Sequence, residues 1–124
     1  MTVLVDSDIL IEVLRGKDQQ ILSRWAELGQ SDHLILYSPV SSAELWAGTR
    51  PGEYEPLGKL FRLLRCAPMD DEVGRRAGDY LRQYGKSHGL ELGDALIASG
   101  ACLNAAKLWT RNRKHYPMKE LSFY

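Results

Sequence analysis

Three acidic residues lie far apart in the chain, yet each falls near the start of a predicted helix. They are Asp6, Glu44 and Asp94, and each sits within an apolar or small-residue stretch. A lone carboxylate beside an apolar core costs free energy, and three carboxylates brought together repel one another. A hard divalent cation relieves both problems because it prefers oxygen ligands. We therefore ask whether the fold gathers these acids around a cation such as Mg2+.

Each acid also has a purely structural interpretation. Asp6 can cap the helix that follows it. Glu44 stands three residues after Ser41, the spacing of a capping box. Asp94 falls in the first helical turn, where the helix dipole favours a negative charge. Because each acid taken alone fits either interpretation, the case for a site depends on the set.

Length and charge restrict the class of protein. The chain has 124 residues, which predicts one domain over residues 1–124. Its 16 basic and 16 acidic residues cancel, so a nucleic acid would have to meet a local basic patch. The isolated cysteines, Cys66 and Cys102, indicate buried thiols in a reducing compartment. Without a visible signal segment or a run of about 20 apolar residues, we expect a cytoplasmic protein.

Apolar runs alternate with helical patterns along the chain. Strands are expected at residues 2–5, 33–37 and 107–110, with short ones near 66–69 and 121–124. Helices are expected at about 7–14, 19–28, 41–48, 57–64, 71–88 and 92–106, the last rich in small residues. This alternation predicts an α/β fold: an open, mostly parallel sheet with helices on both faces.

That fold would place the acids at one edge. Ligands of open parallel sheets bind beyond the carboxyl ends of the strands. Asp6 ends the first strand, Glu44 begins the helix after the second, and Thr110 and Asn112 end the strand near 107–110. The helix of Asp94 should return antiparallel to the strands, which brings its N-terminus to the same edge.

Four segments resemble the motifs of a known family. Residues 5–16 (VDSDILIEVLRG), 41–48 (SSAELWAG), 92–98 (LGDALIA) and 108–116 (LWTRNRKHY) are similar to the successive motifs of PIN-domain proteins, above all the VapC-type toxins of bacterial toxin–antitoxin pairs. The resemblance spans nearly the whole chain, in order. It implies a three-layer α/β/α fold with a short, mostly parallel central sheet.

The resemblance also implies an activity and partners. It implies an endoribonuclease that hydrolyses RNA phosphodiesters with a carboxylate-held Mg2+ or Mn2+ and an activated water. It implies that a VapB-like antitoxin neutralises the enzyme. The implied assemblies are a homodimer and a toxin–antitoxin hetero-oligomer. Carried over by position, Asp6, Glu44 and Asp94 form the acidic site, and Thr110 supports it. Asn112 stands where many members carry a fourth acid, which puts a second metal in doubt.

Further residues are assigned by their neighbourhood. Arg111, Arg113 and Lys114 cluster beside the expected site and could bind RNA phosphates, although a solvated turn explains them equally well. An apolar surface for the antitoxin is expected from Trp25, Trp46, Leu57 and Phe61.

Two other functions start from the same residues. An apolar strand followed by Asp6 and Asp8 also resembles the opening of haloacid-dehalogenase-like phosphatases, with a nucleophile and an acid/base in that order. Those phosphatases have longer chains, whereas this chain is short and has its other candidate site acids at Glu44 and Asp94. A non-catalytic or weakly active PIN-like RNA-binding module is the other alternative, because Asn112 brings no charge.

Overall fold

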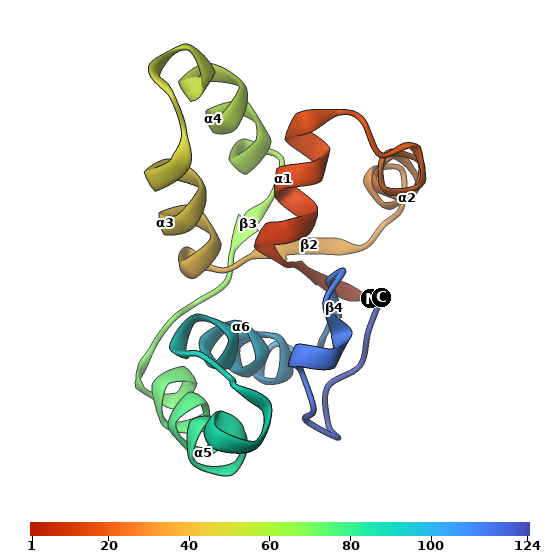
Figure 1. The fold of residues 1–124 in the computed structure, drawn as a ribbon. Helices are drawn as coiled ribbons and strands as arrows, with labels where there is room; N and C mark the ends of the chain where they lie inside the picture. Colours follow the sequence, from red (N-terminus) through yellow and green to blue (C-terminus); the bar gives the residue numbers. More distant parts are fainter.

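The sheet of this protein has four short parallel strands. The computed structural model describes all 124 residues (Figure 1). The strands are β1 (Thr2–Val5), β2 (Leu34–Tyr37), β3 (Arg65–Cys66) and β4 (Ala106–Trp109). They lie in the order β3-β2-β1-β4, and every pairing is parallel. The parallel sheet predicted from the alternating pattern is therefore confirmed.

Helices cover both faces of this sheet. They are α1 (Ser7–Arg15), α2 (Gln19–Gly29), α3 (Pro39–Gly48), α4 (Tyr54–Arg62), α5 (Asp71–His88) and α6 (Leu92–Leu103), with short 3-10 turns η1 (Pro51–Glu53) and η2 (Arg113–His115). Figure 1 shows α1 to α4 on one side of the sheet and α5 with α6 on the other. This is the expected α/β/α arrangement.

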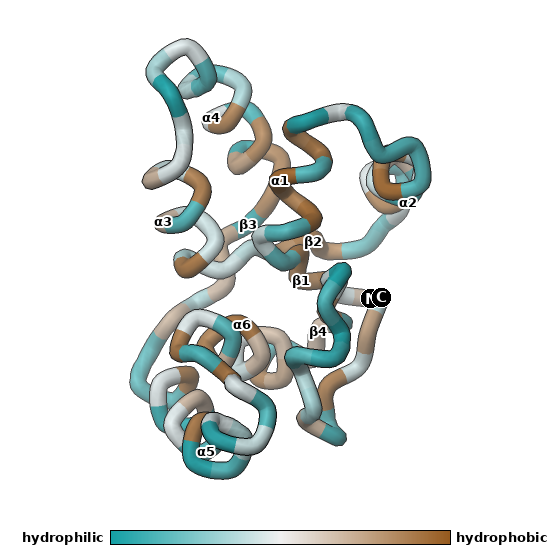
Figure 2. Tube along the Cα trace, in the orientation of Figure 1, coloured by the Kyte–Doolittle hydropathy of each residue, from teal (hydrophilic) through white to brown (hydrophobic).

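Side-chain alternation in β1 divides the interior into two cores. Val3 and Val5 point into the core formed with α1, α2 and α4, whereas Leu4 points into the core formed with α5 and α6. All three side chains are fully buried. Figure 2 shows hydrophobic residues concentrated along α1 and β1, and hydrophilic ones along much of α5. A central strand buried on both faces explains why residues 3–5 form an unbroken apolar run.

The helix that carries Glu44 begins earlier than predicted. Ser38 is its N-cap, accepting a hydrogen bond at 3.1 Å from the backbone N–H of Val40, and Pro39 occupies the first turn. Proline is favoured there because its missing N–H would have no helical partner. Ser41 and Glu44 therefore lie inside α3, and the predicted capping box is wrong.

The chain after α6 also differs from its prediction. The helix ends at Leu103, and Ala105 adopts a left-handed conformation with φ of 50° that turns the chain into β4. Within α6, the small residues Ala95, Ala98 and Ala101 are fully buried against the sheet and α5, as expected. The predicted last strand is reduced to a parallel bridge between Leu108 and Phe123.

The cysteines and the helix lengths bear on other expectations. Cys66 and Cys102 are both free thiols. Cys66 is exposed, so its predicted burial is wrong: it ends the edge strand β3, outside both cores. None of the helices combines the length and apolar character needed to cross a membrane.

Candidate acidic site

A polar pocket of about 270 Å3 opens at the carboxyl ends of β1 and β4. It gathers Asp6, Glu44, Asp94 and Asn112, which strand-edge geometry places at one edge of the sheet. Its complete lining is Asp6, Ser7, Asp8, Ile11, Glu44, Glu91, Gly93, Asp94, Ile97, Asn112, His115 and Tyr116. Five of these residues are acidic, so the pocket has a strongly negative wall.

Asp6 is the most constrained of these acids. It caps α1, because its Oδ1 accepts a hydrogen bond at 2.7 Å from the backbone N–H of Ser7. Its Oδ2 accepts hydrogen bonds at 2.8 Å from the hydroxyls of both Thr110 and Tyr116. The residue is only 7% exposed. The capping role expected for Asp6 is therefore present, together with a place in the pocket.

Glu44 is tied to the residue that follows Asp6. The Ser7 hydroxyl oxygen lies 2.9 Å from Glu44 Oε1 and 2.7 Å from the Ser41 hydroxyl oxygen. Ser7 has one hydroxyl proton, so it can donate only one hydrogen bond. When the Ser41 hydroxyl donates to the Ser7 oxygen, the Ser7 proton is directed to Glu44. Ser41 is fully buried inside α3, so this chain fixes the Glu44 carboxylate against the start of α1.

Asp94 combines a structural and an electrostatic role. It lies in the first turn of α6 and accepts a hydrogen bond at 3.3 Å from the backbone N–H of Glu91, as a capping-box residue. Burial raises the pKa of its carboxyl, and the charge of Asp6 raises it further. The Glu91 N–H and the charge of His115 act in the opposite direction. Asp94 thus holds its proton more readily than an exposed acid, as expected in a negative pocket.

Asp8 is a fourth carboxylate at the same edge. Its Oδ2 accepts a hydrogen bond at 3.0 Å from the backbone N–H of Arg111 and lies 3.4 Å from the Thr110 hydroxyl. Its Oδ1 is buried and has no hydrogen-bond partner. Burial raises the pKa of the Asp8 carboxyl, followed by the charge of Asp6. A buried oxygen without a donor costs free energy, which a nearby cation would offset.

This donor set fits a hard divalent cation. Acidic residues from α1, α3 and α6 line one polar cavity. Burial and the charge of Asp6 raise the pKa of two of them, Asp8 and Asp94, so these two carboxyls resist ionisation. The side chains do not close into a compact group of three or more metal-ligating residues. An acid-lined pocket of this kind suits Mg2+, which retains several waters and takes only one or two carboxylates directly.

The basic residues next to the pocket differ in whether their side chains have intramolecular partners. Arg111 is ion-paired with Glu12, at 3.1 Å from Nη1 to Oε1. Arg113 donates a hydrogen bond at 3.1 Å to the carbonyl oxygen of Tyr124 and lies over the Phe123 ring. Lys114 is exposed and forms no ion pair. Of the three residues predicted to bind RNA, only Lys114 has a side chain without an intramolecular partner.

Sequence reasoning missed two hydroxyl residues of this site. Ser7 contacts Glu44 and Tyr116 contacts Asp6, yet neither was expected to have a role in the site. The signal for Ser7 was its place between two acids, one residue beyond the residue that ends a buried strand. Tyr116 is the aromatic that ends the segment 108–116, which resembles a family motif, but its place in a basic turn six residues beyond Thr110 gave no reason to expect it beside Asp6.

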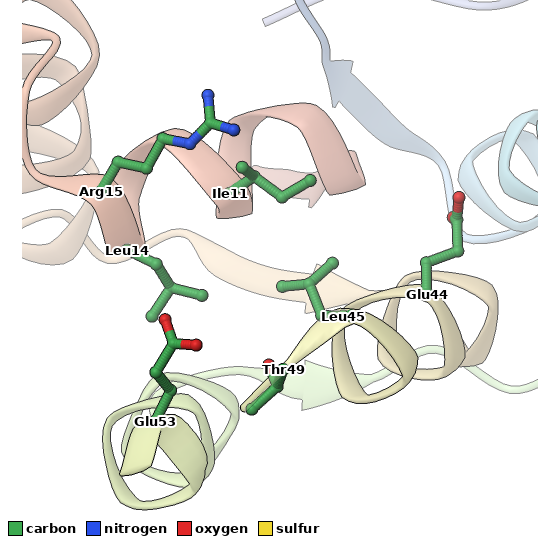
Figure 3. Close-up of a pocket in the computed structure, with 8 residues that line it drawn as sticks. Ile11, Leu14, Arg15, Glu44, Leu45, Thr49 and Glu53 are labelled. Atoms are coloured by element: carbon green, nitrogen blue, oxygen red, sulfur yellow. The ribbon is translucent and has the colours of Figure 1, made fainter. Parts of the chain in front are cut away.

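A groove adjoins the acidic pocket and shares Ile11 and Glu44 with it. Its volume is about 350 Å3. Figure 3 shows Ile11 and Leu14 of α1 on one side and Leu45 and Thr49 of the α3 segment on the other. Ile11 and Leu14 are 37% and 41% exposed. The remaining lining residues include Arg15, Glu44, Gly48 and Glu53.

The apolar surface predicted for an antitoxin is only partly present. Leu57 and Phe61 are core residues on the inner face of α4, so their predicted exposure is wrong. Trp25 packs in a stacked arrangement against Trp109. Trp46 remains 41% exposed, beside Tyr54 and Phe61. The exposed apolar side chains of α1 instead line the groove.

Three layers of α/β/α architecture with an acidic pocket at the carboxyl edge of a parallel sheet define the class of this protein. Its residues 3–121 match the PIN domain, and the chain belongs to the PIN-domain family. The phosphatase alternative is therefore not retained.

Two curated relatives come from Mycobacterium tuberculosis. The chain is 40% identical to "Ribonuclease VapC10" over 120 residues, 95% of this chain and 88% of that one. It is 33% identical to "Ribonuclease VapC19" over 116 residues, 93% of this chain and 92% of that one. A solved VapBC2 complex from Rickettsia felis, bound to a promoter DNA fragment, has the same fold, with a TM-score of 0.83, 21% identity and coverage of 100% and 98% of the two chains.

Proposed function

We propose that this protein is a metal-dependent endoribonuclease, acting in the cytoplasm as a single PIN-like domain and as the toxin of a toxin–antitoxin pair. The observation that carries this proposal is the pocket in which Asp6, Glu44 and Asp94 converge. The 40% identity to a VapC ribonuclease over nearly the whole chain supports the reaction class.

In this proposal Asp6 and Asp94 hold the cation directly, and Mn2+ can replace Mg2+. Glu44 is either a third ligand or the group that orients the attacking water. When bound, the cation supplies a Lewis acid for the phosphoryl oxygens and lowers the pKa of a bound water. Asn112 adds an amide at the pocket but no charge, so the proposal includes one cation and does not extend to a second.

The chain's own residues supply positioning. Ser7 restrains the Glu44 carboxylate from the start of α1, and Thr110 restrains that of Asp6 from the end of β4. Lys114 contacts an RNA phosphate near the pocket, and Arg113 joins it after releasing Tyr124. Phosphate contacts of this kind hold RNA in place without reading its bases.

The partner in this proposal is a VapB-like antitoxin, and the assembly is a homodimer of this chain bound to antitoxin. An antitoxin segment lies in the groove between α1 and the α3 segment, where Ile11 and Leu14 expose apolar surface. The groove shares Glu44 with the acidic pocket, so a basic side chain on that segment reaches the acids. This contact blocks the cation and the RNA together.

RNA cleavage by purified, antitoxin-free protein tests the proposal. Structured RNAs should be cut in the presence of Mg2+ or Mn2+ and left intact in EDTA, and added antitoxin should stop the reaction. Binding of RNA without cleavage under any of these conditions would favour the non-catalytic PIN-like module, the alternative that the uncharged Asn112 suggests.

A further inference from the structure

We propose that Tyr116 is a positioning residue of the acidic pocket, whose buried hydroxyl fixes the Asp6 carboxylate in the orientation that binds a divalent cation. The inference rests on the proposed function for the role of Asp6, and it adds a residue that neither the resemblance nor the comparisons assign.

The phenol ring of Tyr116 is anchored in the core. The residue is 4% exposed and packs in the cluster that contains Leu108, Met118 and Leu121. Its hydroxyl emerges at the pocket wall and donates a hydrogen bond at 2.8 Å to Asp6 Oδ2. Because the ring is held by packing, the direction of this hydrogen bond is set by the fold.

The hydrogen bonds that Asp6 accepts determine which of its acceptor positions is left free. A carboxylate offers about four acceptor positions, two on each oxygen. Thr110 and Tyr116 occupy both positions of Oδ2, and the Ser7 backbone N–H occupies one on Oδ1. The remaining acceptor position is therefore on Oδ1. The two hydroxyls select the carboxylate rotamer that leaves this position for a cation.

The Tyr116 hydroxyl remains a donor under all ordinary conditions. Burial raises its pKa well above the usual value of 10.0, and the charges of Asp6 and Asp94 raise it further. Groups that orient a metal ligand in this way raise its affinity for the metal, and their loss costs about 10- to 100-fold in metal affinity or activity.

Tyr80 provides a matched control within the same chain. It is also 4% exposed, belongs to the same hydrophobic cluster, and donates a hydrogen bond at 2.5 Å to the Glu120 carboxylate. It does not line the acidic pocket. The Tyr80→Phe variant therefore removes a partly buried phenol–carboxylate hydrogen bond without touching the site, so it reports the structural effect of losing a phenol hydroxyl from this cluster.

Mn2+ titration of antitoxin-free protein, followed by electron paramagnetic resonance, tests the inference. We expect Tyr116→Phe to weaken Mn2+ binding by about tenfold and to lower kcat for RNA more than it raises KM. Tyr80→Phe should bind Mn2+ as the wild type does, and thermal melts in EDTA should show a similar loss of stability in both variants.

Wild-type Mn2+ affinity in Tyr116→Phe would overturn the inference, as would a wild type that binds no Mn2+. If the wild type binds Mn2+ but cleaves no RNA, while Tyr116→Phe still binds Mn2+ more weakly, the positioning role stands and the proposed ribonuclease function fails.

Discussion

The hydroxyl of Ser7 lies 2.9 Å from Glu44 Oε1 and joins the start of α1 to the interior of α3. Ser7 is 8% exposed, so water competes little for this contact. Two residues with 36 others between them in the sequence are thus connected at the wall of the pocket. This contact explains how Glu44, a residue inside a helix, is held with a defined orientation toward the other acids.

Removing that contact should lower activity more than stability. In Ser7→Ala, Glu44 loses the donor that orients it, and we expect a drop in kcat of about tenfold, since misplaced catalytic groups cost rate steeply. Single-turnover RNA cleavage measures this. Ser99→Ala is the control, because Ser99 is fully buried and donates to the Val73 carbonyl, and neither residue lines the pocket. Equal losses of activity in both variants would show that Ser7 has only a structural role.

The raised pKa values of Asp8 and Asp94 predict a dependence of stability on pH. Both carboxyls ionise more readily in the unfolded chain than in the folded protein. Their contribution to stability is present below the ordinary pKa of 3.8 and is lost as the pH rises through the folded values. In EDTA, Asp8→Asn and Asp94→Asn should therefore gain melting temperature relative to the wild type as the pH is raised.

Thermal melts between about pH 4 and pH 8 measure this effect, which should reach a few degrees at neutral pH. Asparagine at position 94 still offers an oxygen to the Glu91 N–H, so the helix cap is retained. A constant difference from the wild type at all pH values would contradict the electrostatic origin.

The intramolecular contacts of the basic residues predict unequal effects on RNA binding. Lys114→Ala should weaken RNA binding and reduce the slope of log affinity against log salt by about one. Arg111→Ala should change the affinity less, because Arg111 must first leave Glu12. Filter binding in EDTA across a range of salt concentrations measures both. A larger effect of Arg111→Ala would mean that RNA displaces the Glu12 ion pair easily.

Replacing Asn112 with an acid should increase the affinity of the pocket for a divalent cation. Asn112→Asp adds a carboxylate to the lining of the pocket, next to acids that already repel one another. The variant should be less stable in EDTA and should bind Mn2+ more tightly than the wild type, since added ligand charge strengthens cation binding. Calorimetric titration measures the affinity and the stoichiometry, and unchanged affinity would exclude Asn112 from the cation site.

The sequence predicted the sheet well because its strands are buried runs with a clear boundary. Thr2–Val5 ends at Asp6, as expected, and the two faces of β1 lead to two separate cores. Helix starts were harder to place. The sequence predicts the helix of Glu44 from residue 41, whereas Ser38 and Pro39 together open α3. Cap residues act locally, and several serines in a row leave the choice of cap to tertiary packing.

Three of the five acids of the pocket could be identified from their positions at a strand end (Asp6) or near the start of a helix (Glu44 and Asp94), but their partners could not. Tyr116 reaches Asp6 across 109 intervening residues, through the turn that η2 makes after β4. Nothing in the local pattern around Tyr116 encodes that contact, because it depends on the path of an irregular segment. Cys66 illustrates the same limit, since the exposure of an edge strand depends on which strand lies outermost.

The most direct test of the central claim is the rate of RNA cleavage by Asp94→Asn in the presence of Mg2+. Asp71→Asn is its matched control, because Asp71 also lies in the first turn of a helix but its side chain is 92% exposed and far from the pocket lining. The account predicts loss of metal-dependent cleavage in Asp94→Asn and wild-type cleavage in Asp71→Asn. Wild-type cleavage by Asp94→Asn would contradict it.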